Sequence, residues 1–159
     1  MNTIDFAIKM ELEGQKYYLE QSEINKDNEL HTVFAMLAAS EMEHAELLQR
    51  YKMREALYLS RHFIRPDIKP VFRDLKSFQK EHTEKQLDAY RLASIQEEKS
   101  IELYQEMLNE AVEPSDKEVF EFLIGQEKEH LNLFEDLVIM LLRPEEWVES
   151  AEFGVREDY

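Results

Sequence analysis

Residues 120–141 read FEFLIGQEKEHLNLFEDLVIML, and this stretch predicts both the fold and the site. Its apolar residues recur at alternating steps of three and four, which is the pattern of a helix that buries one face. Glu127 and His130 interrupt that face at its middle. A bare carboxylate buried among apolar side chains is costly unless something compensates its charge. The predicted buried face consists of Phe120, Leu123, Glu127, His130, Phe134, Leu137 and Leu141.

Three further segments, at 4–18, 34–51 and 87–108, carry apolar stripes with the same kind of interruption. A Glu three residues before a His lies on the same helix face, so the two side chains can contact one ion. Four buried Glu are therefore predicted, and together they need a compensating charge. The interrupting residues of the three segments are Glu11, then Glu41 with His44, and then Glu97.

The two halves of the chain repeat each other at a fixed offset of 86 residues. A single Glu-x-x-His is a weak signal in a chain so rich in Glu. Its recurrence in register on four apolar stripes is a strong one. We interpret the chain as one helix hairpin used twice, which would bring the polar residues of both halves to one level of the core. The matched pairs are Glu11 with Glu97, Tyr18 with Tyr104, Glu41 with Glu127, and His44 with His130.

The four stripes predict an all-α, four-helix bundle. Short turns within each half and a long connection between the halves predict two antiparallel hairpins joined by a crossover. We expect the bundle to occupy residues 1–143 and an acidic C-terminal tail to occupy 144–159. The expected helices span about 4–24, 29–59, 84–112 and 115–142.

Local signals predict where these helices begin and where the crossover lies. Thr3 is the expected N-cap of the first helix, and Ser115 with Glu118 forms a capping box for the last one. Two closely spaced prolines keep the crossover, at about 60–83, out of long helix. A short helix is expected within it at about 71–78.

Composition excludes several classes of protein. The length of 159 residues is that of one ordinary domain. A net charge of −16 argues against binding to nucleic acid or to an anionic membrane. No apolar run approaches the roughly 20 residues of a membrane span, and the first residues show no apolar leader, so we expect a cytoplasmic protein. The absence of Cys excludes disulfides, zinc–thiolate sites, iron–sulfur clusters and thiol nucleophiles.

The six interrupting residues form a metal-binding set. Four carboxylates and two imidazoles, without sulfur, suit iron or manganese better than a structural zinc ion. The charges of four Glu would balance those of two divalent ions. Either Glu41 with Glu127 or Glu11 with Glu97 would bridge the ions, and the sequence leaves this choice open.

The sequence resembles the ferritin-like superfamily and, within it, the rubrerythrin-type di-iron proteins. The resemblance covers roughly residues 4–142 and is carried by ELEGQKYY at 11–18, EMEHA at 41–45, residues 97–104, and EKEH at 127–130. It implies a ferritin-like bundle with two iron ions, with manganese as a second possible metal. It also implies reduction of hydrogen peroxide or dioxygen, with Tyr18 and Tyr104 close to the centre. The implied iron ligands are Glu11, Glu41, His44, Glu97, Glu127 and His130.

The chain departs from the family pattern at two points. Ser100 stands where rubrerythrins have an additional Glu, three residues after the ligand Glu97. The family's C-terminal rubredoxin domain has Cys pairs, and this chain has no Cys, so we expect an external protein to donate the electrons. Gly14 and Ser100, each three residues after a ligand Glu, are predicted to leave room for the centre.

The same residues are also compatible with a ferroxidase that serves iron storage or transport, with a dimanganese catalase-like enzyme, and with a metal-free scaffold. The sequence leaves these functions open. We expect a homodimer, because a bundle of this kind often buries more surface by pairing. His31, His62 and His82 lack a Glu three residues earlier and are predicted to lie at the surface or in the crossover.

Overall fold

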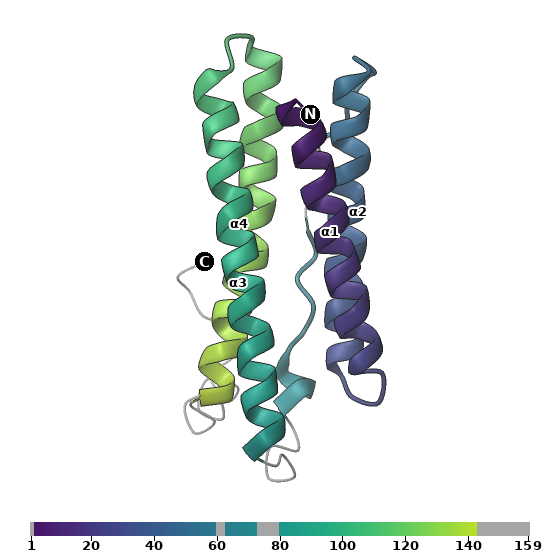
Figure 1. Cartoon of the computed structure of the whole chain (residues 1–159), viewed down its shortest axis with the longest axis vertical. Helices are drawn as coiled ribbons and strands as arrows, with labels where there is room; N and C mark the ends of the chain where they lie inside the picture. The colour runs from purple at the N-terminus through teal and green to yellow at the C-terminus, as the bar shows by residue number, and fades with distance from the viewer. Residues whose placement is uncertain (1, 60–62, 73–79, 143–159) are drawn as a thin grey trace.

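The computed structural model describes residues 2–59, 63–72 and 80–142, and in this part the chain is an all-α, four-helix bundle (Figure 1). Helices α1 and α2 pack as one antiparallel hairpin and α3 and α4 as a second one. The predicted fold class is confirmed. The elements in chain order are α1 (Thr3–Ile24), α2 (Leu30–Lys52), the 3-10 helix η1 (Lys69–Phe72), α3 (Lys80–Glu110) and α4 (Pro114–Leu142).

Two predicted caps are wrong, each by a shift of one or two residues. Helix α1 includes Thr3, so Asn2 is its N-cap, and the Asn2 side chain accepts a 2.8 Å hydrogen bond from the Asp5 amide. Helix α4 begins at Pro114. Ser115 therefore lies inside the first turn and does not cap it. Proline suits that first position because the missing N–H would have no partner inside the helix.

Helix α2 ends at Lys52, well before the predicted end near residue 59. The end is a Schellman motif: Glu55 N donates to Arg50 O, and Arg54 N donates to Tyr51 O. Arg54 takes the left-handed conformation, with φ 56°, at the position where Gly is usual. Because the sequence offers no Gly there, the apolar pattern alone places the end too late.

The crossover runs back along the bundle from the end of α2 toward the start of α3 (Figure 1). Its helical turn, η1, ends at Phe72 and so covers only the first part of the short helix predicted near 71–78. The rest of that prediction, at 73–79, lies outside the described residues, as does the predicted tail at 144–159. Helix α3 begins at Lys80, earlier than predicted.

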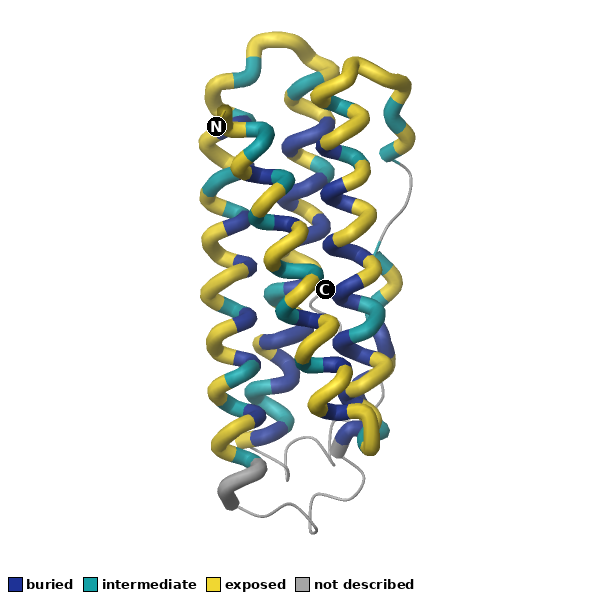
Figure 2. Tube along the Cα trace, turned by 45° about the vertical axis from the view of Figure 1, so that its right-hand side comes forward, coloured by how far each residue is buried: buried dark blue, intermediate teal, exposed yellow. Residues whose placement is uncertain are grey.

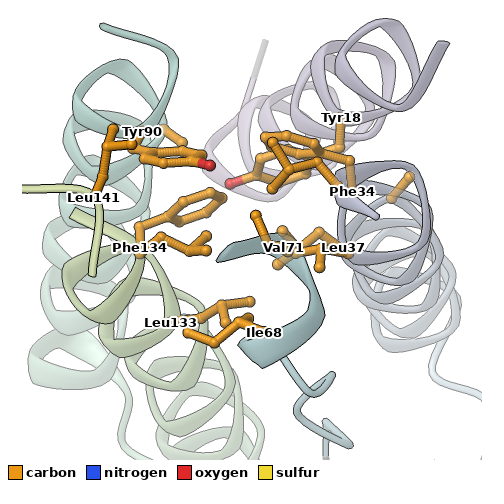
Figure 3. Close-up of a cluster of buried hydrophobic side chains, with 14 residues drawn as sticks. Tyr18, Phe34, Leu37, Ile68, Val71, Tyr90, Leu133, Phe134 and Leu141 are labelled. Atoms are coloured by element: carbon orange, nitrogen blue, oxygen red, sulfur yellow. The ribbon is translucent and has the colours of Figure 1, made fainter. Parts of the chain in front are cut away.

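Buried positions line the inner faces of all four helices (Figure 2) and form two apolar clusters. The first contains a group of packed rings, in which Tyr18 lies 6.1 Å from Phe34 and 5.8 Å from Phe134 between ring centroids. Ile68 and Val71 of the crossover complete this cluster (Figure 3). The second cluster surrounds Tyr104.

None of the helices in the described ranges combines the length and the hydropathy that crossing a bilayer requires.

The ring cluster gives a test of what holds the bundle together. Phe134 is fully buried, so Phe134→Ala should lower the free energy of unfolding by about 3–5 kcal/mol. Phe6 is half exposed, and Phe6→Ala should cost less than about 1 kcal/mol. Chemical denaturation followed by circular dichroism measures both. Equal losses in the two variants would contradict this account of the core, and Phe134→Leu serves if the alanine variant does not fold.

Candidate metal centre

The structure brings the six predicted residues together at the middle of the bundle, with every helix contributing. Helix α1 supplies Glu11 and α3 supplies Glu97, while α2 and α4 each supply a Glu and a His. All six side chains are buried: none exposes more than 4% of its surface, and Glu11, Glu127 and His130 expose none.

The six residues form two overlapping groups. One group holds Glu11 and His44, the other holds Glu97 and His130, and Glu41 and Glu127 belong to both. Within each group, one oxygen or nitrogen atom from every residue lies within 4.8 Å of the others. The arrangement repeats the two-fold pattern of the sequence in space.

Both imidazoles turn Nδ1 toward the carboxylates. His44 Nδ1 lies 2.8 Å from Glu127 Oε1 and 3.4 Å from Glu11 Oε2. His130 Nδ1 lies 2.9 Å from Glu41 Oε1 and 3.2 Å from Glu97 Oε1. In each case the nearest carboxylate comes from the opposite hairpin.

The other ring nitrogen of each His contacts a residue that the sequence analysis missed. His130 Nε2 lies 2.9 Å from Ser40 Oγ, and His44 Nε2 lies 3.5 Å from Gln126 Oε1. Ser40 and Gln126 are equivalent in the repeat, since each directly precedes the shared Glu of its helix. The repeat register was the signal that could have found them. A partner on this nitrogen orients the ring and favours Nδ1 as the metal-binding atom.

The two tyrosines reach across the bundle. Tyr18 donates a hydrogen bond to Glu97 Oε1, with 2.5 Å between the oxygens. Tyr104 likewise donates a hydrogen bond to Glu11 Oε1. Each Tyr therefore bonds to the Glu of the other hairpin and not to the Glu on its own helix. Burial and the nearby carboxylates raise the pKa of both phenols well above the ordinary value, so both remain protonated donors.

Gly14 leaves space beside a carboxylate of the centre, as predicted. A Cβ atom at Gly14 would lie 3.0 Å from Glu41 Oε2, a distance that would force the carboxylate to move. Ser100 is buried, and its hydroxyl turns away from the centre to Gln96 O (3.1 Å) and Met10 Sδ (3.6 Å). Ser100 therefore supplies neither charge nor ligand to the centre.

Several buried polar atoms of the centre make no hydrogen bond, and all of them except Glu97 Oε2 are in contact across a histidine–carboxylate pair, at 2.8–3.5 Å. Buried carboxylates are costly unless protons or cations oppose their charge, so this set fits a metal site. Oxygen and nitrogen donors without sulfur fit iron or manganese. The atoms without a hydrogen bond are Glu11 Oε2, Glu41 Oε1, His44 Nδ1, Glu97 Oε2, and both oxygens of Glu127.

Burial and the neighbouring charged groups shift the pKa values of three carboxylates of the centre. Burial first, and then the neighbouring carboxylates, hold the pKa of Glu41 and Glu97 well above the ordinary value. Burial acts in the same direction on Glu127, but contact with Glu97 and the charge of His44 outweigh it and hold its pKa well below that value.

Burial acts on the pKa of the two histidines in the opposite direction from its effect on the carboxylates. Burial alone would lower the pKa of each imidazole, but the carboxylates outweigh it. They raise the pKa of His44 well above normal and that of His130 to about 10. Without metal, protons therefore supply part of the positive charge that the carboxylates need.

The remaining histidines lie away from the centre as far as the structure describes them. His31, in the first turn of α2, is exposed, and its Nδ1 lies 3.0 Å from Ser22 Oγ near the end of α1. His62 and the side chain of His82 lie outside the described part.

A protein-family model described as Rubrerythrin matches residues 2–138, which include all six residues of the centre and both tyrosines. Among curated proteins and solved structures, no significant match is found.

The histidine pKa values predict how the stability of the metal-free chain depends on pH. The folded chain keeps a proton on His130 up to about pH 10, whereas the unfolded chain releases it near pH 6.5. This contribution to stability is present below about pH 6.5 and is lost as pH rises toward 10, so stability should fall across that window.

Urea denaturation of chelator-treated protein at several pH values measures this slope. His130→Gln removes the titrating group and should flatten the slope. A stability that rises across the same window would contradict the prediction.

Proposed function

The chain belongs to the rubrerythrin family of ferritin-like di-iron proteins, and on that basis we propose that it is a di-iron carboxylate oxidoreductase. It reduces hydrogen peroxide or dioxygen with electrons from an external donor. The observation that carries the proposal is the buried centre of four carboxylates and two imidazoles, whose donor atoms fall into two overlapping groups that could each hold an ion.

The overlapping groups support an assignment of the ligands. Glu11 and His44 would hold one metal ion, and Glu97 and His130 would hold the other. Glu41 and Glu127, which belong to both groups, would be shared by the two ions. Of the two bridging pairs that the sequence left open, this assignment favours Glu41 with Glu127. Two divalent ions would also balance the charge of the four carboxylates.

The chemistry needs two electrons and two protons for each peroxide, and it yields two molecules of water. When bound, a pair of ferrous ions would supply the two electrons, and the external donor would restore them. The residues of the chain would hold the metal ions, keep bulk water away from them, and orient the carboxylates.

Tyr18 and Tyr104 act as positioning residues in this proposal. Each hydroxyl donates to one oxygen of a terminal Glu, which leaves the other oxygen of that carboxylate without a hydrogen-bond partner. These hydrogen bonds hold the carboxylates of Glu97 and Glu11 in place at the centre. Ser40 orients the His130 ring through a 2.9 Å contact, and Gln126 contacts the His44 ring more loosely, at 3.5 Å.

Metal content tests the proposal first. Protein loaded anaerobically with Fe(II) should hold about two iron ions per chain. Glu41→Ala removes a shared ligand and His130→Ala removes a terminal one, so the iron content of both variants should fall sharply. Peroxide consumption with a chemical reductant then measures activity, which should fall with the iron content. A folded helical protein that binds no metal would overturn the proposal and indicate a metal-free scaffold.

The same assays distinguish a catalase-like enzyme and an iron-storage protein from the proposed oxidoreductase. Peroxide turnover without any reductant in manganese-loaded protein would indicate a catalase-like enzyme. Fe(II) oxidation together with a large closed shell in solution would indicate iron storage, and a small oligomer would argue against it.

The tyrosines give a second test. Tyr18→Phe and Tyr104→Phe should each lower activity or iron affinity by about 10–100-fold, because the carboxylates lose their orientation. Tyr90 is the matched control: it is also fully buried, and its hydroxyl has no hydrogen-bond partner in the described structure. Tyr90→Phe should leave both properties unchanged. Equal effects in all three variants would show that the loss reflects core packing and not positioning.

A further inference from the structure

We propose that a pocket beside His44 is the port through which divalent cations reach and leave the centre, and that the crossover closes the His130 side. The two metal positions would then exchange with solution at different rates, although the sequence repeat makes their ligands equivalent. The inference rests on the proposed metal site.

The pocket joins a buried metal-ligand residue to the molecular surface. It has a volume of about 420 Å³. Its wall contains two buried side chains of the site, His44 and Gln126, and exposed ones such as Glu46, Arg50 and Tyr58. Since buried and exposed residues line one cavity, an ion in the pocket lies next to His44 while still in contact with solvent.

The contact between His44 and Gln126, which both line the pocket, is loose. His44 Nε2 and Gln126 Oε1 are 3.5 Å apart, at the outer limit of a hydrogen bond. At the equivalent position of the other half, His130 Nε2 lies 2.9 Å from Ser40 Oγ, which is an ordinary hydrogen-bond distance. The shortest Nδ1 contacts of the two rings are alike, at 2.8 and 2.9 Å, so His44 is the less firmly held of the two only at Nε2.

The crossover covers the other half of the centre. The ring of Phe63 packs edge-on against the His130 imidazole, with 4.6 Å between ring centroids. Arg65 donates to the carboxylate of Asp136 on α4, and Ile68 is buried in the core, so this segment is anchored at two points. His130 lines neither this pocket nor the larger one at the end of the bundle.

The charge around the pocket favours a cation. Glu43 and Glu46 line it together with Arg50, and the chain as a whole has a net charge of −16. Charged walls raise the local concentration of ions of opposite sign and speed their entry. The effect is screened by salt because these side chains are exposed.

Exchange kinetics test the port. Co(II) is the probe, because its visible absorption reports binding without any redox step. At equilibrium, titration should give about two Co(II) per chain. Excess chelator should then remove the metal in two phases of similar amplitude, a fast one for the His44 position and a slow one for the His130 position.

Two kinds of variant assign the phases. Phe63→Ala removes the ring over His130 and should accelerate the slow phase severalfold; Phe63→Leu, which keeps most of the bulk, should change it less. Glu43→Lys reverses a charge at the port and should slow Co(II) loading by about fivefold at low salt and by much less at high salt. Glu129→Lys is the matched control, because Glu129 is the exposed repeat equivalent of Glu43 beside His130 and lies outside the pocket.

The outcomes separate this inference from the proposed function. Failure to bind close to two Co(II) would overturn the proposed metal site, and the port with it. Full binding with a single release phase would overturn the port alone. A slow phase that Phe63→Ala leaves unchanged, or equal slowing of loading in Glu43→Lys and Glu129→Lys, would also overturn it while leaving the metal site intact.

Discussion

Four carboxylates held at one level of an apolar bundle are the constraint that governs this structure. Each is shielded from water, so its charge must be opposed by hydrogen-bond donors, protons or cations. Two phenol hydroxyls and two imidazoles oppose part of this charge. The raised pKa values of Glu97 and His130 favour protons on these groups, which oppose a further part. The apolar clusters hold the four helices around a centre whose charges would otherwise push them apart.

The contacts of the centre cross between the hairpins, and this couples the site to the fold. Tyr18 of the first hairpin donates a hydrogen bond to Glu97 of the second, and Tyr104 of the second donates one to Glu11 of the first. Each histidine also has its nearest carboxylate on the opposite hairpin. Neither hairpin alone can therefore satisfy its own buried polar groups, so the centre forms only when the two hairpins dock.

The crossover makes the two halves of a symmetric centre unequal. It starts early, because Arg54 ends α2 in a left-handed turn, and it then runs back along the bundle. Phe63 reaches His130 from this segment, whereas His44 lines an open pocket. An inserted connection has no counterpart in the other half of the repeat, so it packs against one side of the centre while a pocket reaches the other, although the six residues themselves repeat.

The amino-acid sequence was enough to predict the helical fold, the hairpin repeat and the six residues of the centre. Helical periodicity and the fixed offset can be read directly from the order of the residues. Together they place Glu and His at matching positions within apolar stripes. The same reasoning missed the end of α2, where an Arg takes a conformation usual for Gly, and it missed Ser40 and Gln126. The folded structure was needed to show which Tyr meets which Glu, which Glu pair is shared, and which side of the centre is covered, because those contacts depend on how the two hairpins and the crossover dock.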